Sequence, residues 1–324
     1  MTRVTRLFAS CAGLAAGLAA AFAPMTAFAW EPTKPVEFVV PAGTGGGADQ
    51  MARLIQGIIV KHKLMKESMV VVNKSGGAGA ESFLEVKEAK VNPHKIIITL
   101  SNLFTTPMAT GVPFSWKDMT PVSMMALDQF VLWVNAEAPY KTASEFVAAV
   151  KAAGPSKMKM GGTGSKQEDQ ILTVGLEKAT GTKFIYVPFK GGGEATAAIL
   201  GGHVTVGTSG WGELQEFVQS GKLRAIAITA PARLKGVPVA TLKEQGVNVE
   251  IGNWRGVYAP PGITPEQRKA LADAVTKATK TKGWAELLEK NSWTPVLMTG
   301  PDFDQFVDHS HAELRALMVK LGMI

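Results

Sequence analysis

The chain has 324 residues and a formal net charge of +7, with 34 Lys and Arg against 27 Asp and Glu. This length suggests about two domains and is sufficient to bury a core without disulfides. The basic residues are scattered and are not interleaved with aromatic side chains, which gives no support for nucleic-acid binding. Cys11 is the only cysteine, so the rest of the chain has no disulfide, thiolate metal site or cysteine nucleophile.

Residues 1–29 have the organisation of an export signal. Two arginines precede an apolar run over 7–23, and Ala27-Phe28-Ala29 is a small-x-small cleavage site. We expect cleavage after Ala29, which removes both arginines and leaves an exported protein of net charge +5. A lipid anchor at Cys11 is disfavoured because too little apolar sequence precedes it. No later stretch is apolar over the length that a membrane span needs.

Strand and helix patterns alternate along the first part of the chain. Val36–Val40 is a continuous apolar run, as expected for a strand buried on both faces. Apolar residues at helical spacing follow from near Ala48. A second strand is predicted over 70–72, a helix over 81–90, and a third strand over 96–100.

The alternation restarts near residue 129 and continues to the C-terminus. Strands are predicted over 130–134, 157–160, 184–187, 204–207, 223–229 and 254–259. Helices are predicted over 143–152, 171–181, 195–200, 265–280, 284–291 and 301–321. Two blocks of strand–helix units predict an α/β protein with parallel sheets, helices on the sheet faces, and a cleft between two lobes.

Three glycine-rich turns, at 41–47, 161–165 and 188–193, each follow a predicted strand and precede a helix. A helix start has unpaired N–H groups and a partial positive charge, and glycine lets an anion approach the main chain. These turns therefore predict a site for a small anion, most simply a carboxylate. The segment 43–48 also fits the dinucleotide pattern G-x-G-x-x-A. However, the second strand ends in Asn73 instead of the acid that would hold a ribose, and no P-loop occurs.

Several side chains near these turns have two possible roles. Asp49 either orients a ligand group or stabilises the start of its own helix. Thr163 and Ser165 either donate to a carboxylate, with charge added by Lys166, or cap a helix. Arg255 either pairs with a ligand carboxylate in a bidentate manner or forms an ion pair between the lobes.

Catalytic and metal-binding patterns are weak. The sequence has no G-x-S-x-G elbow, and its five histidines lack zinc-ligand spacing. Glu168 and Asp169 fall in a first helical turn, where acids are structurally favourable. We therefore expect no enzymatic activity, metal or cofactor. A secreted hydrolase that uses the same cleft is the alternative from another class.

Segments distributed along most of the chain resemble one family, the periplasmic solute-binding receptors of tripartite tricarboxylate transporters (TctC or Bug-type receptors). The matching segments include 34–41, 45–49, 72–79, 162–165, 187–192, 200–204, 220–225, 254–256 and 259–262. The resemblance implies a type II Venus-flytrap fold with two crossing strands. It implies one domain made of 30–128 and 252–324 and another made of 129–251.

The resemblance further implies a periplasmic, monomeric receptor that captures a small carboxylate and delivers it to a membrane permease. Many relatives carry an apolar or aromatic residue where Arg255 stands, which favours a di- or tricarboxylate such as citrate. A role in presenting the ligand to a membrane sensor is a further alternative. The candidate ligand-binding residues are Gly43, Thr44, Gly45, Gly46, Ala48, Asp49, Asn102, Thr163, Gly164, Ser165, Lys166, Lys190, Thr208, Ser209 and Arg255.

Overall fold

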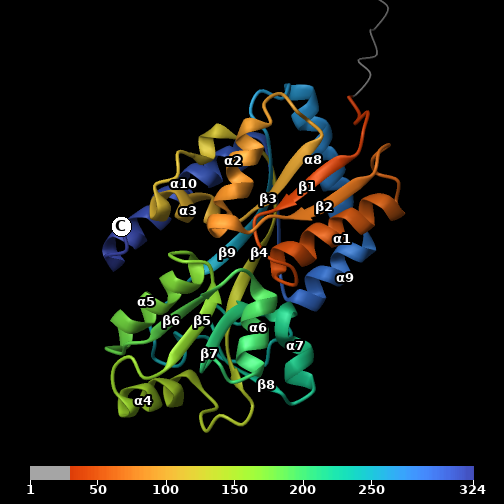
Figure 1. Cartoon of the computed structure of the whole chain (residues 1–324). Coiled ribbons are helices and arrows are strands. Elements are labelled where there is room, and N and C mark those ends of the chain that lie inside the picture. The colour runs from red at the N-terminus through yellow and green to blue at the C-terminus, as the bar shows by residue number, and fades with distance from the viewer. Residues whose placement is uncertain (1–29) are drawn as a thin grey trace, which may run out of the picture.

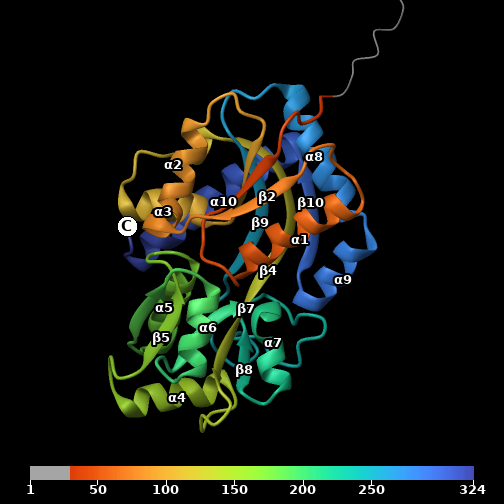
Figure 2. The same ribbon diagram turned by 45° about the vertical axis from the view of Figure 1, so that its right-hand side comes forward.

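A computed structural model describes residues 30–324, so the predicted export signal lies outside the described residues. Figure 1 shows two α/β halves, one above the other. We call the half that contains β1–β3, β10, α1–α3 and α8–α10 the first lobe, and the half that contains β5–β8 and α4–α7 the second lobe. Figure 2 shows the long strand β4 (Thr120–Asn135) running from one lobe into the other.

The sheet of the first lobe has the strand order β2-β1-β3-β9-β4, with β10 paired to β4. Its strands are β1 (Val36–Val40), β2 (Met69–Asn73), β3 (Lys95–Thr99), β9 (Gly252–Ala259) and β10 (Thr294–Thr299). The apolar runs of β1 and β3 are almost fully buried because helices cover both faces of this sheet.

The helices of the first lobe form two layers around this sheet. On one face lie α1 (Gly47–Lys61), α8 (Pro265–Thr279) and α9 (Lys282–Asn291). On the other face lie α2 (Ala80–Glu88), α3 (Asn102–Thr110) and α10 (Gly300–Leu321). The carboxyl ends of the parallel strands point toward the second lobe, which brings the turns after β1 and β2 to the junction between the lobes.

The second lobe repeats this arrangement. Strands β5 (Lys159–Thr163), β6 (Ile185–Phe189), β7 (Val206–Gly210) and β8 (Leu223–Ile228) join the second half of β4. Helices α4 (Ala143–Ala153) and α5 (Glu168–Thr180) cover one face, and α6 (Gly192–Leu200) and α7 (Trp211–Gln219) cover the other. Along β4, Leu132 and Val134 enter one core while Val131 and Trp133 enter the other.

The strand partners of β4 change at one point along its length. Gln129 pairs with Gly252 of β9, whereas Phe130 pairs with Gly210 of β7. The two sheets are therefore continuous through β4. The division into 30–128 with 252–324 and 129–251 stays a prediction.

The fold class and most elements agree with the sequence predictions, but there are differences. Helices α3 and α7 and strand β10 were not expected. The two helices were missed because each follows a strand almost without a turn, and α3 also contains Pro107. The sheets are mixed, since β4 runs antiparallel to β7, β8, β9 and β10. Residues Gly161–Thr163, Pro188 and Phe189, and Thr208–Gly210 lie in strands instead of turns.

Among residues 30–324, no helix combines the length and the hydropathy that crossing a membrane requires.

Candidate functional site: a cavity between the lobes

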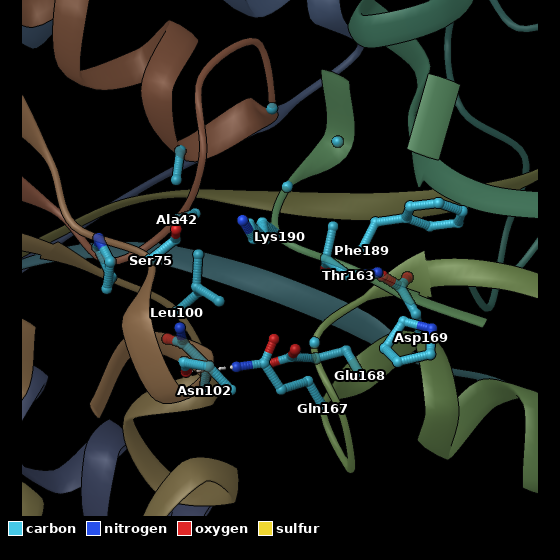
Figure 3. A pocket seen from close by; sticks show the side chains of 18 of the residues that line it. Ala42, Ser75, Leu100, Asn102, Thr163, Gln167, Glu168, Asp169, Phe189 and Lys190 are labelled. Atoms are coloured by element: carbon cyan, nitrogen blue, oxygen red, sulfur yellow. Dashed lines mark hydrogen bonds between the residues drawn. The ribbon is translucent and has the colours of Figure 1, made fainter. Parts of the chain in front are cut away.

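A cavity of about 700 Å³ lies between the two lobes. The first lobe contributes the turn after β1, residues 75–78 after β2, and the start of α3. The second lobe contributes the start of α5, the turn between β6 and α6, and the end of β7, while Asn253 and Arg255 line the cavity from β9. Figure 3 shows Ser75 and Asn102 from the first lobe facing Lys190 and Glu168 from the second. A volume of this size is typical of small-molecule sites.

The cavity brings together most, but not all, of the predicted site residues. Those that line it are Gly46, Ala48, Asn102, Thr163, Gly164, Ser165, Lys190, Thr208, Ser209 and Arg255. Those that do not line it are Gly43, Thr44, Gly45, Asp49 and Lys166. The separation of this second group from the cavity has identifiable structural causes.

The turn formed by Gly43, Thr44 and Gly45 makes a contact between the lobes at the edge of the cavity. The Gly43 N–H donates to the Lys190 carbonyl over 3.0 Å. A Cβ added to Gly193 would lie only 2.8 Å from the Thr44 carbonyl oxygen, so the two main chains pass close together. These glycines therefore serve lobe–lobe packing, which the sequence pattern does not distinguish from close approach to a ligand.

Asp49 has a structural role, the second of the two interpretations of its position. Its carboxylate accepts hydrogen bonds from the Gly45 N–H (3.0 Å) and from Asn73 (2.9 Å), and it forms an ion pair with Arg53 (2.9 Å). Burial raises the pKa of Asp49, but the donors from Arg53, Gly45 and Asn73 outweigh burial and leave the pKa below its usual value. Asp49 thus fixes the turn after β1 instead of facing the cavity.

Lys166 is held in an unusual backbone conformation beside the cavity. Its φ is +55°, and its N–H donates to the Gln170 side chain over 2.6 Å. The lysine therefore belongs to the turn that precedes α5, and its side chain is outside the cavity lining.

Arg255 pairs with Asp128, and both lie on the strands that meet between the lobes. The guanidinium donates from Nε to Asp128 Oδ2 over 3.1 Å and also from Nη2 to the same oxygen. The side chains are almost fully buried, with residue exposures of 4% for Arg255 and 1% for Asp128. Of the two alternatives for Arg255, the ion pair is the one observed. The expected pair linked the two lobes, whereas the observed pair joins the crossing strands β4 and β9. The preference for a di- or tricarboxylate assumed that Arg255 was available to the ligand, and its pairing with Asp128 removes that support.

Asp169 binds the hydroxyl group of Thr163, one of the two that were expected to donate to a carboxylate, and that of Thr208, another candidate ligand-binding residue. It accepts from the Thr163 N–H (2.6 Å), the Thr163 hydroxyl (2.8 Å) and the Thr208 hydroxyl (2.5 Å). Burial raises the pKa of Asp169, and these donors and Arg255 act in the opposite direction. The acid at the start of α5 therefore ties β5 and β7 together.

Main-chain N–H groups of both lobes remain available at the cavity. Within residues 30–324, the N–H groups of Ala42 and Ser75 in the first lobe and of Ser165 and Gln167 in the second have no hydrogen-bond partner. Gly164 sets the turn in the second lobe, because its φ of +61° is in the left-handed region and an added Cβ would collide with the Gln167 side chain. Unpaired N–H groups on residues that line a common space are suited to binding an anion.

Two hydrogen bonds close the lobes around the cavity. Ser101 at the start of α3 donates to Glu168 at the start of α5. The Gln167 amide donates to the Ala78 carbonyl over 2.8 Å. The structure is therefore a closed arrangement of the lobes.

Sequence reasoning did not identify two glutamates that line the cavity. Burial raises the pKa of Glu168 to about 7, and the charge of Asp169 contributes to this rise. Burial likewise raises the pKa of Glu213 to about 7, with a contribution from Asp128. Glu168 was interpreted only as a helix-start acid, and Glu213 lies just after the unpredicted junction between β7 and α7. The environment of both glutamates depends on the closure of the lobes, which local sequence patterns do not reveal.

The candidate site has no metal-binding set: within residues 30–324, no group of three or more His, Cys, Asp or Glu side chains is arranged to hold a metal ion. Two α/β lobes joined through long strands, with a cavity between them and main-chain donors on both sides, define the class of bilobal solute-binding proteins of the periplasmic type. The chain belongs to the tripartite tricarboxylate transporter family receptors (TctC), whose sequence description it matches over residues 51–323.

Individual relatives agree with this assignment. A protein of Cupriavidus necator, described as a UPF0065 protein in the gbd 5′ region, is 29% identical over 98% of both chains. A solved structure described as a periplasmic transporter is 27% identical and superimposes with a TM-score of 0.85, covering 90% of this chain and 98% of the other. A structure of an R. palustris protein with adipate is 23% identical, has a TM-score of 0.84 with the same coverage, and supports the fold.

Proposed function

We propose that this chain is a periplasmic receptor that binds a small organic carboxylate between its lobes and delivers it to a tripartite transporter in the membrane. The proposed lobes are residues 30–128 with 252–324 and residues 129–251. Membership of the receptor family supports the transport role, and an R. palustris protein of the same fold is described with adipate.

The observation that carries this proposal is the set of unpaired N–H groups at one cavity. Ala42 and Ser75 offer donors from the first lobe, and Ser165 and Gln167 offer donors from the second. A carboxylate has two oxygens that together accept about four hydrogen bonds, so it can bind donors of both lobes simultaneously. A ligand that contacts both lobes favours the closed arrangement, because its affinity for the closed state exceeds that for an open one.

Isothermal titration calorimetry with the mature chain tests the proposal directly. The probes are acetate, succinate, adipate, malate and citrate, together with the neutral amide succinamide as a control. The proposal requires at least one carboxylate to bind in the cavity and succinamide not to bind. Absence of heat and of thermal stabilisation with every carboxylate at millimolar concentration contradicts it.

A matched pair of variants links binding to the turn in the second lobe. Gly164→Ala introduces a side chain at φ +61° that collides with Gln167 and moves the neighbouring Ser165 N–H. Gly181→Ala introduces the same kind of backbone strain at φ +68°, but nothing lies within 4 Å of the added Cβ. Both changes cost about 1–2 kcal/mol of backbone energy. Only Gly164→Ala is expected to weaken carboxylate binding, and equal loss in both variants would contradict the assignment.

A further inference from the structure

Carboxylates outnumber cations around the cavity. Glu168, Asp169, Glu194 and Glu213 all line it. The two cations in the lining are Lys190, which is solvent-exposed, and Arg255, whose charge is shared with the β4 carboxylate described above. Acidic groups are therefore in excess in the closed site, which disfavours a solute of high negative charge.

Two of these carboxylates are incompletely paired. Asp169 has three donors, as described above. Glu168 uses one oxygen to accept from Ser101, and Glu213 uses one oxygen to accept from the Gly210 N–H over 3.2 Å. The other oxygen of each glutamate has no hydrogen-bond partner within residues 30–324. Neither oxygen is among the side-chain atoms that are closed off from solvent, and both residues line the cavity, so a donor or cation of a ligand can reach these oxygens.

Two further acceptors at the cavity are also unpaired. Asn102 Oδ1 and Ser209 Oγ have no partner, but both atoms are buried beneath the cavity surface and are not open to a solute. Asn102 is next in the chain to Ser101, the partner of Glu168, so the start of α3 contacts Glu168 directly. A simple carboxylate supplies acceptors only and cannot pair with the free oxygens of Glu168 and Glu213. An ammonium group supplies three donors and a positive charge.

We propose that the solute is an amino-carboxylate. Its carboxylate binds the main-chain N–H groups, and its ammonium group donates to the free oxygen of Glu168. This inference rests on the proposed function, because it places the second functional group of a carboxylate solute in the same cavity.

Calorimetry at pH 7 with matched probes tests the inference. The pairs are 4-aminobutanoate and butanoate, aspartate and succinate, and glutamate and glutarate. Coupling between closely placed charges supports an affinity difference of about tenfold or more in favour of the amino member of the pair that fits the cavity. In Glu168→Gln, where Ser101 can still donate to the side-chain oxygen, this preference is expected to disappear. Glu286→Gln, on the exposed surface of α9, is the matched control and is expected to retain it.

Proton exchange gives an independent readout that does not depend on a variant. Glu168 and Glu213 both have a pKa of about 7, so each is partly protonated at pH 7. A bound ammonium group lowers these pKa values and releases protons, whereas a bound carboxylate without an amine raises them and takes protons up. Titration in two buffers of different ionisation enthalpy measures the sign of this exchange. Asp169 and Arg255 also affect the pKa values of these glutamates, and both residues are present whichever probe is bound.

The possible outcomes separate this inference from the function on which it rests. If the carboxylates without an amine bind as tightly as their amino partners in every pair, or if amino probes bind with proton uptake, the inference is wrong and the carboxylate receptor stands. If neither member of any pair binds, the result counts against both. Thermal unfolding of Glu168→Gln and Glu286→Gln establishes that both variants are folded.

Discussion

Replacement of Arg255 by methionine is a demanding test of the charge balance around the cavity. Arg255 is a buried cation, 4% exposed, that pairs with Asp128. Its charge lowers the pKa of Glu168 and of Glu213. Methionine keeps most of the side-chain volume and removes the charge. The variant therefore leaves Asp128 without its ion-pair partner and the two glutamates without a compensating charge.

The expected cost follows from the burial of the pair. Removing one member of a buried ion pair costs about 3–5 kcal/mol, because the other charge stays buried without compensation. For a chain of this size, 1 kcal/mol corresponds to roughly 2 °C in the melting temperature. We therefore expect Arg255→Met to lower the melting temperature by roughly 6–10 °C at pH 8. Asp128→Asn should cost less, because Arg255 keeps Glu168, Asp169 and Glu213 as neighbouring charges.

Denaturant unfolding of the wild type, both single variants and the double variant provides the assay. The double variant Asp128→Asn, Arg255→Met is expected to recover part of the stability that Arg255→Met loses. Acidification toward pH 5 is expected to narrow the difference between Arg255→Met and the wild type, because the remaining carboxylates become protonated. A loss in Asp128→Asn equal to or greater than that in Arg255→Met would refute the claim that the acids near the cavity are in excess.

Three further predictions concern pH, lobe closure and packing. Because Glu168 and Glu213 have raised pKa values of about 7 in the folded state, the folded chain binds more protons than the unfolded chain. Their contribution to stability therefore falls by about 1 kcal/mol per glutamate between pH 6 and pH 8. Denaturant unfolding at both pH values should show a smaller dependence in Glu168→Gln, and an unchanged dependence would contradict the assignment. Ser101→Ala removes the lobe-to-lobe hydrogen bond and should weaken carboxylate binding about tenfold in calorimetry; unaltered affinity would show that this contact does not favour closure. Gly47→Ala would place a Cβ 2.5 Å from Arg255 Nη2, so thermal unfolding should detect a loss of about 1–3 kcal/mol.

Local patterns in the sequence were sufficient to predict most of the fold. The apolar run Val36–Val40 and the helix that follows it agree with β1 and α1, because alternating strand and helix periods reflect burial on specific faces. Helix α7 could not be predicted in the same way. Its first residue, Trp211, directly follows Gly210 at the end of β7, so no turn residues mark the boundary.

The site was predicted less completely than the fold, for a physical reason. A glycine-rich turn is compatible both with close approach to a ligand and with close approach to another main chain. Gly164 belongs to a turn that lines the cavity, whereas Gly43 contacts the main chain of the second lobe. Only the docking of the lobes distinguishes these cases. The same applies to Glu168 and Glu213, whose burial arises from residues distant in the sequence.

A crystal structure of the mature chain with the tightest-binding probe of the calorimetric series tests the central claim most directly. The account predicts that the probe lies in the cavity between the lobes, with carboxylate oxygens about 2.7–3.2 Å from main-chain N–H groups of both lobes. The Ser165 N–H is the expected donor from the second lobe, and the Ala42 or Ser75 N–H is the expected donor from the first. A probe bound outside this cavity, or held in it by one lobe alone, would contradict the account.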